Sequence, residues 1–252
     1  MPVEKGDAIL IDYVTKIKET GEIFDTTLGE EAKKGGILKE NTVYEPMLVI
    51  VGEGWVLKGL DDSLVGLEEN KPTTIEISPE NGFGLRDPSK IKLVPLRKFR
   101  GQKVSPYPGA QIEVDEKLAI VRSVGAGRVQ VDFNSPLAGK TLVYDLTVKE
   151  IIKGKVERIK VIMHRRIPTV DIQKIKFRTI AKRVSIELPE EAYYLEGIQF
   201  AKRGVAADIQ KYLPEFEKIT FTENYQKEEA KSSTTEPSQE QENDQEDTLS
   251  AQ

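Results

Sequence analysis

Short apolar or alternating runs recur along residues 1–152, some of them stopped by glycine or proline, and this pattern predicts a series of short strands. Apolar and polar residues alternate over 7–18, and a Thr-Gly-Glu turn leads to a second short run, which predicts a β-hairpin. Further apolar runs predict strands at 46–52, 73–77 and 142–148. Leucines at helical spacing predict one short helix that begins near Gly59. We therefore expect an α+β fold in this part of the chain.

The middle section, 89–134, is predicted to be an insertion between two strands of one sheet. It carries short strand-like pieces of its own, and the strong strand at 142–148 follows it. Its apolar residues are too numerous for a solvated flap, so they either close a small core or remain exposed as a binding surface. These residues are Ile91, Leu93, Val94, Leu96, Phe99, Ile112, Val114 and Ile120.

The C-terminal third shows a different pattern, which predicts a small α+β domain of its own. Strand candidates lie at 156–163, 174–180 and 184–188. A long amphipathic helix is predicted to begin at Pro189 and to stop at Pro214, and 216–221 is expected to return as a strand. From about Tyr225 the chain is rich in Glu, Gln, Ser and Thr, so we expect disorder there.

The composition excludes several kinds of chemistry. There is no cysteine, so disulfides, thiolate catalysis and Cys-based zinc sites are ruled out. The single histidine, His164, lies in a basic run and is interpreted as a surface residue away from any carboxylate. Asp61 and Asp62 are interpreted as solvated rather than catalytic. We expect no metal and no cofactor, so any catalysis must depend on shape and hydrogen bonding. No apolar stretch has the length of a membrane span, which favours a soluble, cytoplasmic protein.

Three segments, in order, carry a family pattern. After Tyr13, residues 21–27 read GEIFDTT; residues 51–60 read VGEGWVLKGL and lead to PENGFG at 79–84; residues 134–145 read NSPLAGKTLVYD. Together they resemble the FKBP family of peptidyl-prolyl cis/trans isomerases, and more closely its SlyD-like long-chain branch. Residues 155–222 are similar to the additional C-terminal domain of archaeal members.

The resemblance implies an α+β architecture with an antiparallel half-barrel, a short helix and an inserted small β domain. Its implied domains are an FKBP catalytic domain at 1–88 plus 135–152, an inserted chaperone domain at 89–134, a C-terminal α+β domain at 155–222 and a disordered acidic tail at 225–252.

The resemblance also implies a shallow apolar pocket that binds the proline ring. Its residues carry over to Tyr13, Phe24, Asp25, Met47, Val56, Leu57, Leu60, Phe83 and Tyr144. Leu57 would lend its backbone N–H to a substrate carbonyl, and Asp25 would orient its neighbours without transferring a proton. Leu60 stands where many relatives have tryptophan, and Phe83 where many have tyrosine. Taken singly, Val56 and Tyr144 fit an ordinary barrel core equally well.

The function implied is an isomerase that doubles as a chaperone, with unfolded polypeptides containing X-Pro bonds as partners. One alternative is a holdase that binds chains without catalysis. A second arises from the basic run at 155–183, which suits RNA or a ribosomal surface. This run contains few aromatic residues, so we prefer a solvated, chaperone-like or subunit-contacting face to a nucleic-acid interface. A subunit-contacting face would predict a homodimer through the C-terminal domain. We further hypothesise that the acidic tail shields this face.

Overall fold

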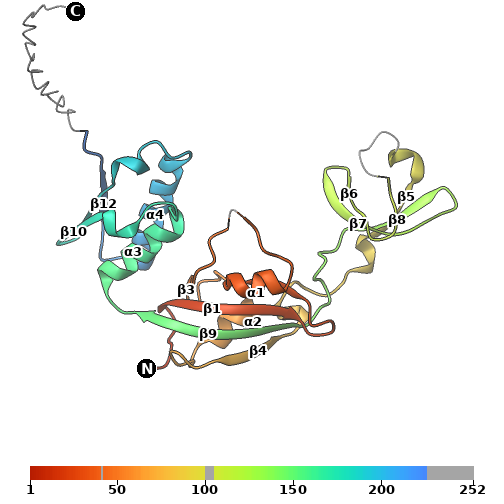
Figure 1. The fold of residues 1–252 in the computed structure, drawn as a ribbon, viewed down its shortest axis with the longest axis horizontal. Coiled ribbons are helices and arrows are strands. Elements are labelled where there is room, and N and C mark those ends of the chain that lie inside the picture. Colours follow the sequence, from red (N-terminus) through yellow and green to blue (C-terminus); the bar gives the residue numbers. More distant parts are fainter. Residues whose placement is uncertain (41, 100–104, 226–252) are drawn as a thin grey trace, which may run out of the picture.

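A computed structural model describes residues 1–40, 42–99 and 105–225, and its centre is a five-stranded antiparallel sheet (Figure 1). The strand order is β2-β1-β9-β4, and β3 also pairs with β1. The strands are β1 (Ala8–Ile17), β2 (Ile23–Thr26), β3 (Met47–Ile50), β4 (Thr73–Ile77) and β9 (Leu142–Ile152). The α+β class with antiparallel sheets is confirmed, as are the hairpin of β1 with β2 and the strands β3, β4 and β9.

One face of this sheet carries the first hydrophobic core. Alternate residues of β1, including Ile9 and Ile11, are fully buried because successive side chains of a strand point to opposite faces. The predicted short helix is α2 (Lys58–Leu64), and its Leu60 and Leu64 pack into the same core. A second short helix, α1 (Gly29–Lys34), follows β2.

The chain leaves the central sheet after β4 and forms a separate four-stranded sheet before it returns as β9. This sheet has the order β5-β8-β7-β6, and its strands are β5 (Ile91–Pro95), β6 (Gln111–Val114), β7 (Lys117–Gly125) and β8 (Arg128–Asp132). Val94, Phe99, Ile112 and Val114 are buried in a core that belongs to this sheet alone. Leu93 is 60% exposed, so this segment has both a small core and uncovered apolar residues.

The C-terminal region contains α3 (Lys155–Arg166), β10 (Lys176–Ile180), β11 (Arg183–Glu187), α4 (Ile198–Tyr212) and β12 (Lys218–Thr222). The predicted strand at 156–163 is wrong, because Ile159, Ile162 and Met163 are buried at the three- and four-residue spacing of a helix. The strands expected at 174–180, 184–188 and 216–221 are confirmed as β10, β11 and β12.

Pro189 does not begin the long helix, contrary to the prediction. It precedes a single 3-10 turn, Glu190–Ala192, and the long helix begins at Ile198 after Gly197, which has a φ of 74°. A left-handed residue breaks the helical path, so the apolar spacing that continues across it misled the prediction. Beyond Tyr225, the segment predicted to be disordered lies outside the described residues.

The C-terminal region packs directly on the central sheet and shares a core with it. Ala8 of β1, Leu48 of β3 and Ile152 of β9 belong to the same cluster as the buried residues of α3 and α4. Trp55 packs against both cores, and its indole N–H donates to the hydroxyl of Tyr212 at 2.7 Å. The region is therefore docked through apolar contacts.

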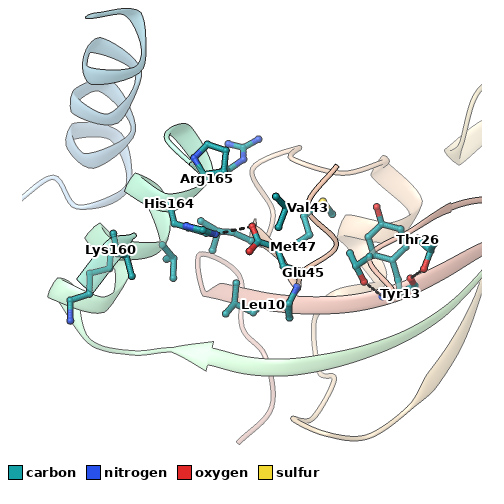
Figure 2. Close-up of a pocket in the computed structure, with 15 residues that line it drawn as sticks. Leu10, Tyr13, Thr26, Val43, Glu45, Met47, Lys160, His164 and Arg165 are labelled. Carbon is teal, nitrogen blue, oxygen red and sulfur yellow. Dashed lines mark hydrogen bonds and ion pairs between the residues drawn. The ribbon is translucent and has the colours of Figure 1, made fainter. Parts of the chain in front are cut away.

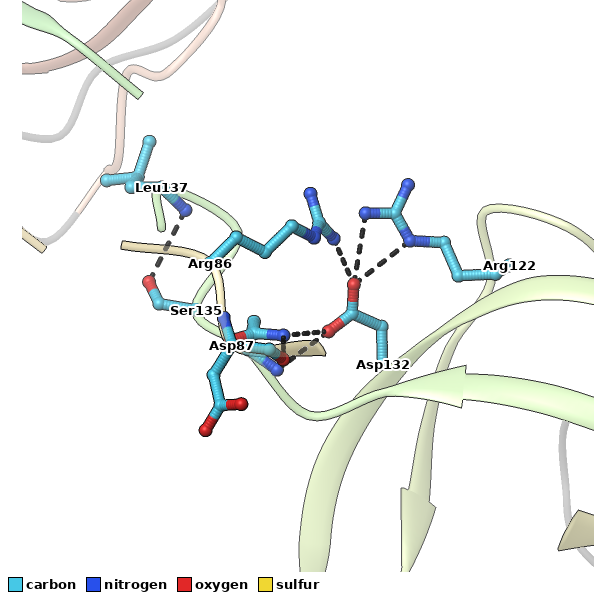
Figure 3. A network of polar contacts seen from close by, with 7 residues as sticks. Arg86, Asp87, Arg122, Asp132, Ser135 and Leu137 are labelled. Atoms are coloured by element: carbon cyan, nitrogen blue, oxygen red, sulfur yellow. Dashed lines mark hydrogen bonds and ion pairs between the residues drawn. The ribbon is translucent and has the colours of Figure 1, made fainter. Parts of the chain in front are cut away.

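The two segments that connect the inserted sheet are held together by the carboxylate of Asp132 (Figure 3). This side chain is 1% exposed and accepts from the guanidinium groups of Arg86 and Arg122 on either side. It also accepts from the backbone N–H of Asn134 at 2.9 Å, while the Asn134 amide bonds the backbone of Asp87. Burial would raise the pKa of Asp132, but the hydrogen bonds from Asn134 and Arg122 outweigh this and hold its pKa below the ordinary value.

Replacing Asp132 with asparagine is expected to lower the free energy of unfolding by about 3 kcal/mol, because it removes the charge that two arginines share in a buried site. A group with a lowered pKa stabilises the fold above the ordinary aspartate pKa of about 4, and this contribution disappears as the pH falls through the lowered value. Urea unfolding from pH 7 to pH 2 should show wild type and Asp132→Asn converging at the acid end. A constant gap across that range would contradict the assigned role.

Candidate active site

The hairpin of β1 and β2 places Tyr13, Phe24 and Asp25 next to one another. The Tyr13 hydroxyl donates to the Asp25 carboxylate at 2.8 Å, and the backbone N–H of Tyr13 donates to the Thr27 hydroxyl at 3.0 Å. Burial of Tyr13 raises its pKa well above the ordinary value, and the negative charge of Asp25 adds to the effect. Tyr13 therefore remains a protonated hydrogen-bond donor at neutral pH.

Tyr144 and Leu60 form the buried floor beside this hairpin. Tyr144 lies on β9 opposite Thr15 of β1, and its ring centroid is 5.7 Å from that of Tyr13. Tyr144 is 6% exposed, and burial raises its pKa. Leu60 comes from the first turn of α2 and is completely buried against the same cluster. The floor is apolar apart from the tyrosine hydroxyls.

The remaining predicted residues surround this floor and are more exposed. Phe83 follows β4, and its ring meets that of Phe24 edge-on at a centroid distance of 6.3 Å. Met47, Val56 and Leu57 are half-buried and pack against the floor. Within the described residues, the backbone N–H of Leu57 donates to no other backbone group. The structure thus brings the nine residues together on one face of the central sheet, with Phe83 contributing the most exposed ring.

The loop that carries Val56 and Leu57 is held by Asp61, which the sequence interpretation placed in water. That interpretation is wrong, because Asp61 is 6% exposed and accepts from the backbone N–H groups of Gly52 at 2.8 Å and Gly54 at 2.9 Å. Both glycines have positive φ, which lets their N–H groups converge on one carboxylate. Two glycines just before an acidic helix start are the local signal for such a contact.

Comparison with known proteins decides the family. Residues 92–137 match the family model described as FKBP26, IF domain, and residues 155–226 match the model described as FKBP26 C-terminal. The short-type peptidyl-prolyl cis-trans isomerase of Methanocaldococcus jannaschii is 33% identical over 149 residues, which cover 59% of this chain and 94% of that protein. The chain belongs to the FKBP family of peptidyl-prolyl isomerases.

Bacterial FKBP relatives match a similar share of the chain. The FKBP-type 16 kDa isomerase of Escherichia coli is 28% identical over 154 residues, covering 59% of this chain and 93% of that protein. The FKBP-type isomerase SlyD of Aeromonas hydrophila is 27% identical over 161 residues, covering 63% and 69%. The predicted resemblance to the SlyD-like branch of the FKBP family is confirmed.

A cavity of about 500 Å³ adjoins these residues and was not foreseen from the sequence (Figure 2). It lies between α3 and the segment that leads into β3, and Tyr13 and Met47 are part of its wall. His164 of α3 contacts Glu45 there, with 2.8 Å between Nε2 and the carboxylate oxygen. His164 is partly exposed, but the expectation that it lies away from any carboxylate is wrong, because residues 119 positions apart meet in the fold.

Among the residues that the structure describes, no group of three or more His, Cys, Asp or Glu side chains is arranged to hold a metal ion. None of the described helices combines the length and the apolar character needed to cross a membrane.

Proposed function

We propose that the nine residues Tyr13, Phe24, Asp25, Met47, Val56, Leu57, Leu60, Phe83 and Tyr144 form the site at which this FKBP-type isomerase rotates X-Pro bonds. The edge-on contact of Phe24 with Phe83 carries the proposal. Phe24 packs on the cluster that buries Tyr144 and Leu60, so the two phenylalanine rings would line an apolar recess, and the backbone N–H of Leu57, which donates to no other backbone group, would lie at its edge. Such a recess needs no nucleophile to favour a twisted amide.

The chemistry follows from the amide bond itself. Rotation about an X-Pro bond crosses a barrier of roughly 18–20 kcal/mol, because the planar amide loses its resonance. The twisted amide is less dipolar than either planar form, so an apolar site poor in water binds it better than the ground state. Phe24, Leu60, Val56 and Tyr144 would hold the proline ring, and the Leu57 N–H would hold a neighbouring carbonyl.

Asp25 serves as a positioning residue in this proposal. It fixes the Tyr13 hydroxyl, whose raised pKa keeps it protonated, and no step of the rotation moves a proton. Leu60 leaves a smaller floor than tryptophan would. Phe83 lacks the hydroxyl that a tyrosine would offer to substrate, which weakens binding rather than removing catalysis.

The proposal is tested by NMR exchange spectroscopy on a short peptide with one X-Pro bond. We expect catalytic amounts of the protein to accelerate cis/trans exchange, since the site binds the twisted amide preferentially. A holdase without catalysis would bind the peptide and leave the exchange rate unchanged, and that result would contradict the proposal.

We further propose that the inserted sheet holds unfolded chains for the isomerase site. Exposed apolar residues on or beside this sheet support a binding surface; they are Leu93, Leu96, Tyr107, Leu118 and Val124. Their number is high for a segment this small, and holding a client there raises its local concentration at the prolyl site.

The contacts of the basic run favour this chaperone function over nucleic-acid binding. Several of its cations already face carboxylates, in the pairs Arg158–Asp7, Arg166–Asp208, Lys174–Glu191, Lys176–Glu187 and Lys182–Glu217. A surface that binds RNA needs uncompensated positive charge. A homodimer through the C-terminal domain and a cytoplasmic location remain predictions.

A further inference from the structure

The cavity between α3 and the segment leading into β3 is joined to the proposed prolyl site by the wall that they share. On one side, β1 pairs first with β3, over Ala8–Ile11, and then with β2, over Val14–Lys16. Asp12 and Tyr13 lie between these two pairings. Tyr13 lines the cavity at this point, and its ring also packs on Tyr144. The cavity and the proposed prolyl site therefore share Tyr13, so a client chain that leaves the prolyl site past this residue would meet the cavity.

The α3 wall of the cavity carries uncompensated positive charge. Three cations of α3 that do not line the cavity are paired, Lys155 with Glu215 at 2.9 Å, Arg158 with Asp7 at 3.7 Å and Arg166 with Asp208 at 2.8 Å. Lys160 and Arg165 both line the cavity, and neither forms an ion pair with any residue in the described part of the chain. Arg165 lies over the Trp55 ring, with its guanidinium carbon 3.8 Å from the ring centroid.

The other charged group in the cavity offsets only part of this charge. Glu45 lies on the opposite wall, where its carboxylate contacts His164 rather than Lys160 or Arg165, and its single negative charge leaves the lining net positive (Figure 2). Apolar side chains make up much of the remaining lining, with Val43, Leu48 and Val161 among them. An apolar recess with two unpaired cations on one wall suits a ligand that combines apolar groups with a carboxylate.

We propose that this cavity is a specificity subsite for client polypeptides, in which the positive charge of Lys160 and Arg165 on the α3 wall favours an aspartate or glutamate close to the isomerised X-Pro bond. The proposal rests on the proposed isomerase function and deepens it. The subsite would let an otherwise apolar and unselective isomerase site prefer X-Pro bonds that have an acidic residue nearby. Acidic neighbours raise the residence time of the client at Phe24 and Tyr144.

The test compares X-Pro peptides that differ only in having Glu, Gln or Lys at one of the three positions on either side of the dipeptide. In at least one position we expect the full-length protein to show about a 5- to 10-fold higher kcat/KM for Glu than for Gln at low salt, the size of a partly exposed ion pair. Molar salt should reduce this ratio to near one, because it shortens the screening length to about 3 Å.

Charge reversal at Lys160 separates this subsite from a general electrostatic effect. Lys160→Glu should move the preference from the Glu peptide to the Lys peptide. Lys155→Glu makes the same charge change on the same helix, outside the cavity, and should keep the preference for Glu. Equal kcat/KM values for the three peptides in wild type, or the same loss of preference in both variants, would overturn the proposal.

Calorimetric binding of the same peptides keeps the two proposals distinguishable. Tighter binding of the Glu peptide that depends on Lys160, with no acceleration of exchange, would support the subsite and contradict the isomerase site. Acceleration without a Glu preference would support the isomerase site and contradict the subsite.

Residues 226–252 are a competing occupant of the cavity, since they contain eight acidic and two basic residues. If a Glu preference is missing in the full chain and emerges only after their deletion, the cavity binds the chain's own segment and the proposal is overturned.

Discussion

Replacing Phe24 with alanine is expected to lower kcat/KM for a short X-Pro peptide by about 30- to 150-fold. The estimate follows from losing about 2–3 kcal/mol of apolar contact with the proline ring in the transition state. The fold should survive, because Phe24 is only half-buried and lies on the short edge strand β2. NMR exchange measures the rate, and circular dichroism with urea unfolding confirms the fold.

A control for this substitution is available on the same strand. Ile23 pairs with Lys16 beyond the irregularity of the hairpin at Phe24, and its side chain lies beside Gly35 rather than in the cluster on which Phe24 packs. Ile23→Ala removes a similar edge contact without touching the proposed recess, and its kcat/KM should stay within about two-fold of wild type. Equal rates for Phe24→Ala and Ile23→Ala would place the proline ring elsewhere.

Deleting 89–134 is expected to leave the isomerisation of short peptides intact but to slow the catalysed refolding of a proline-limited protein by about 10- to 100-fold. The loss corresponds to the local concentration that a tethered client gains. The deletion can be closed by a short turn, because the backbone N–H of Gly139 donates to the carbonyl of Gly84 at 2.8 Å. The readout is the refolding rate at a fixed, catalytic protein concentration.

A milder variant checks that the exposed surface of the inserted sheet is responsible for the effect. Replacing Leu93 and Leu118 with glutamine keeps the buried core of this sheet, since both side chains are more than half exposed. Refolding should slow in the same direction as in the deletion. Refolding at the wild-type rate in both variants would refute the coupling of the inserted sheet to the prolyl site.

The sequence predicted those parts of the fold in which neighbouring residues determine the structure. The hairpin of β1 and β2 and the strand β12 follow from local alternation and turn residues. Helix α3 was mistaken for a strand because its β-branched residues favour extended structure when read in a short window. Ile159, Ile162 and Met163 are buried together against α4 and the central sheet, and this tertiary packing overrides that preference.

The features of the site that were missed all depend on partners distant in the sequence. The single-sequence pattern shows an acidic helix start at Asp61 but not the two N–H groups that it accepts. It shows that His164 lies in a basic run but not that His164 contacts Glu45. It places Asp132 in a strand but does not show that Arg86 forms an ion pair with it. The nine predicted residues came from a family pattern, which already encodes such distant contacts. Neither Lys160 nor Arg165 belongs to that pattern.

Trp55 is the only tryptophan of the chain, and its position makes the junction between the two halves of the molecule optically visible. Its indole meets Tyr212 and Arg165 on one side, while the next residues along the chain, Val56 and Leu57, edge the proposed recess. Emission from this one indole therefore responds when either neighbour moves. A client titration followed by Trp55 emission, without any added dye, would reveal whether binding in the recess changes the contacts of Trp55 with α3 and α4.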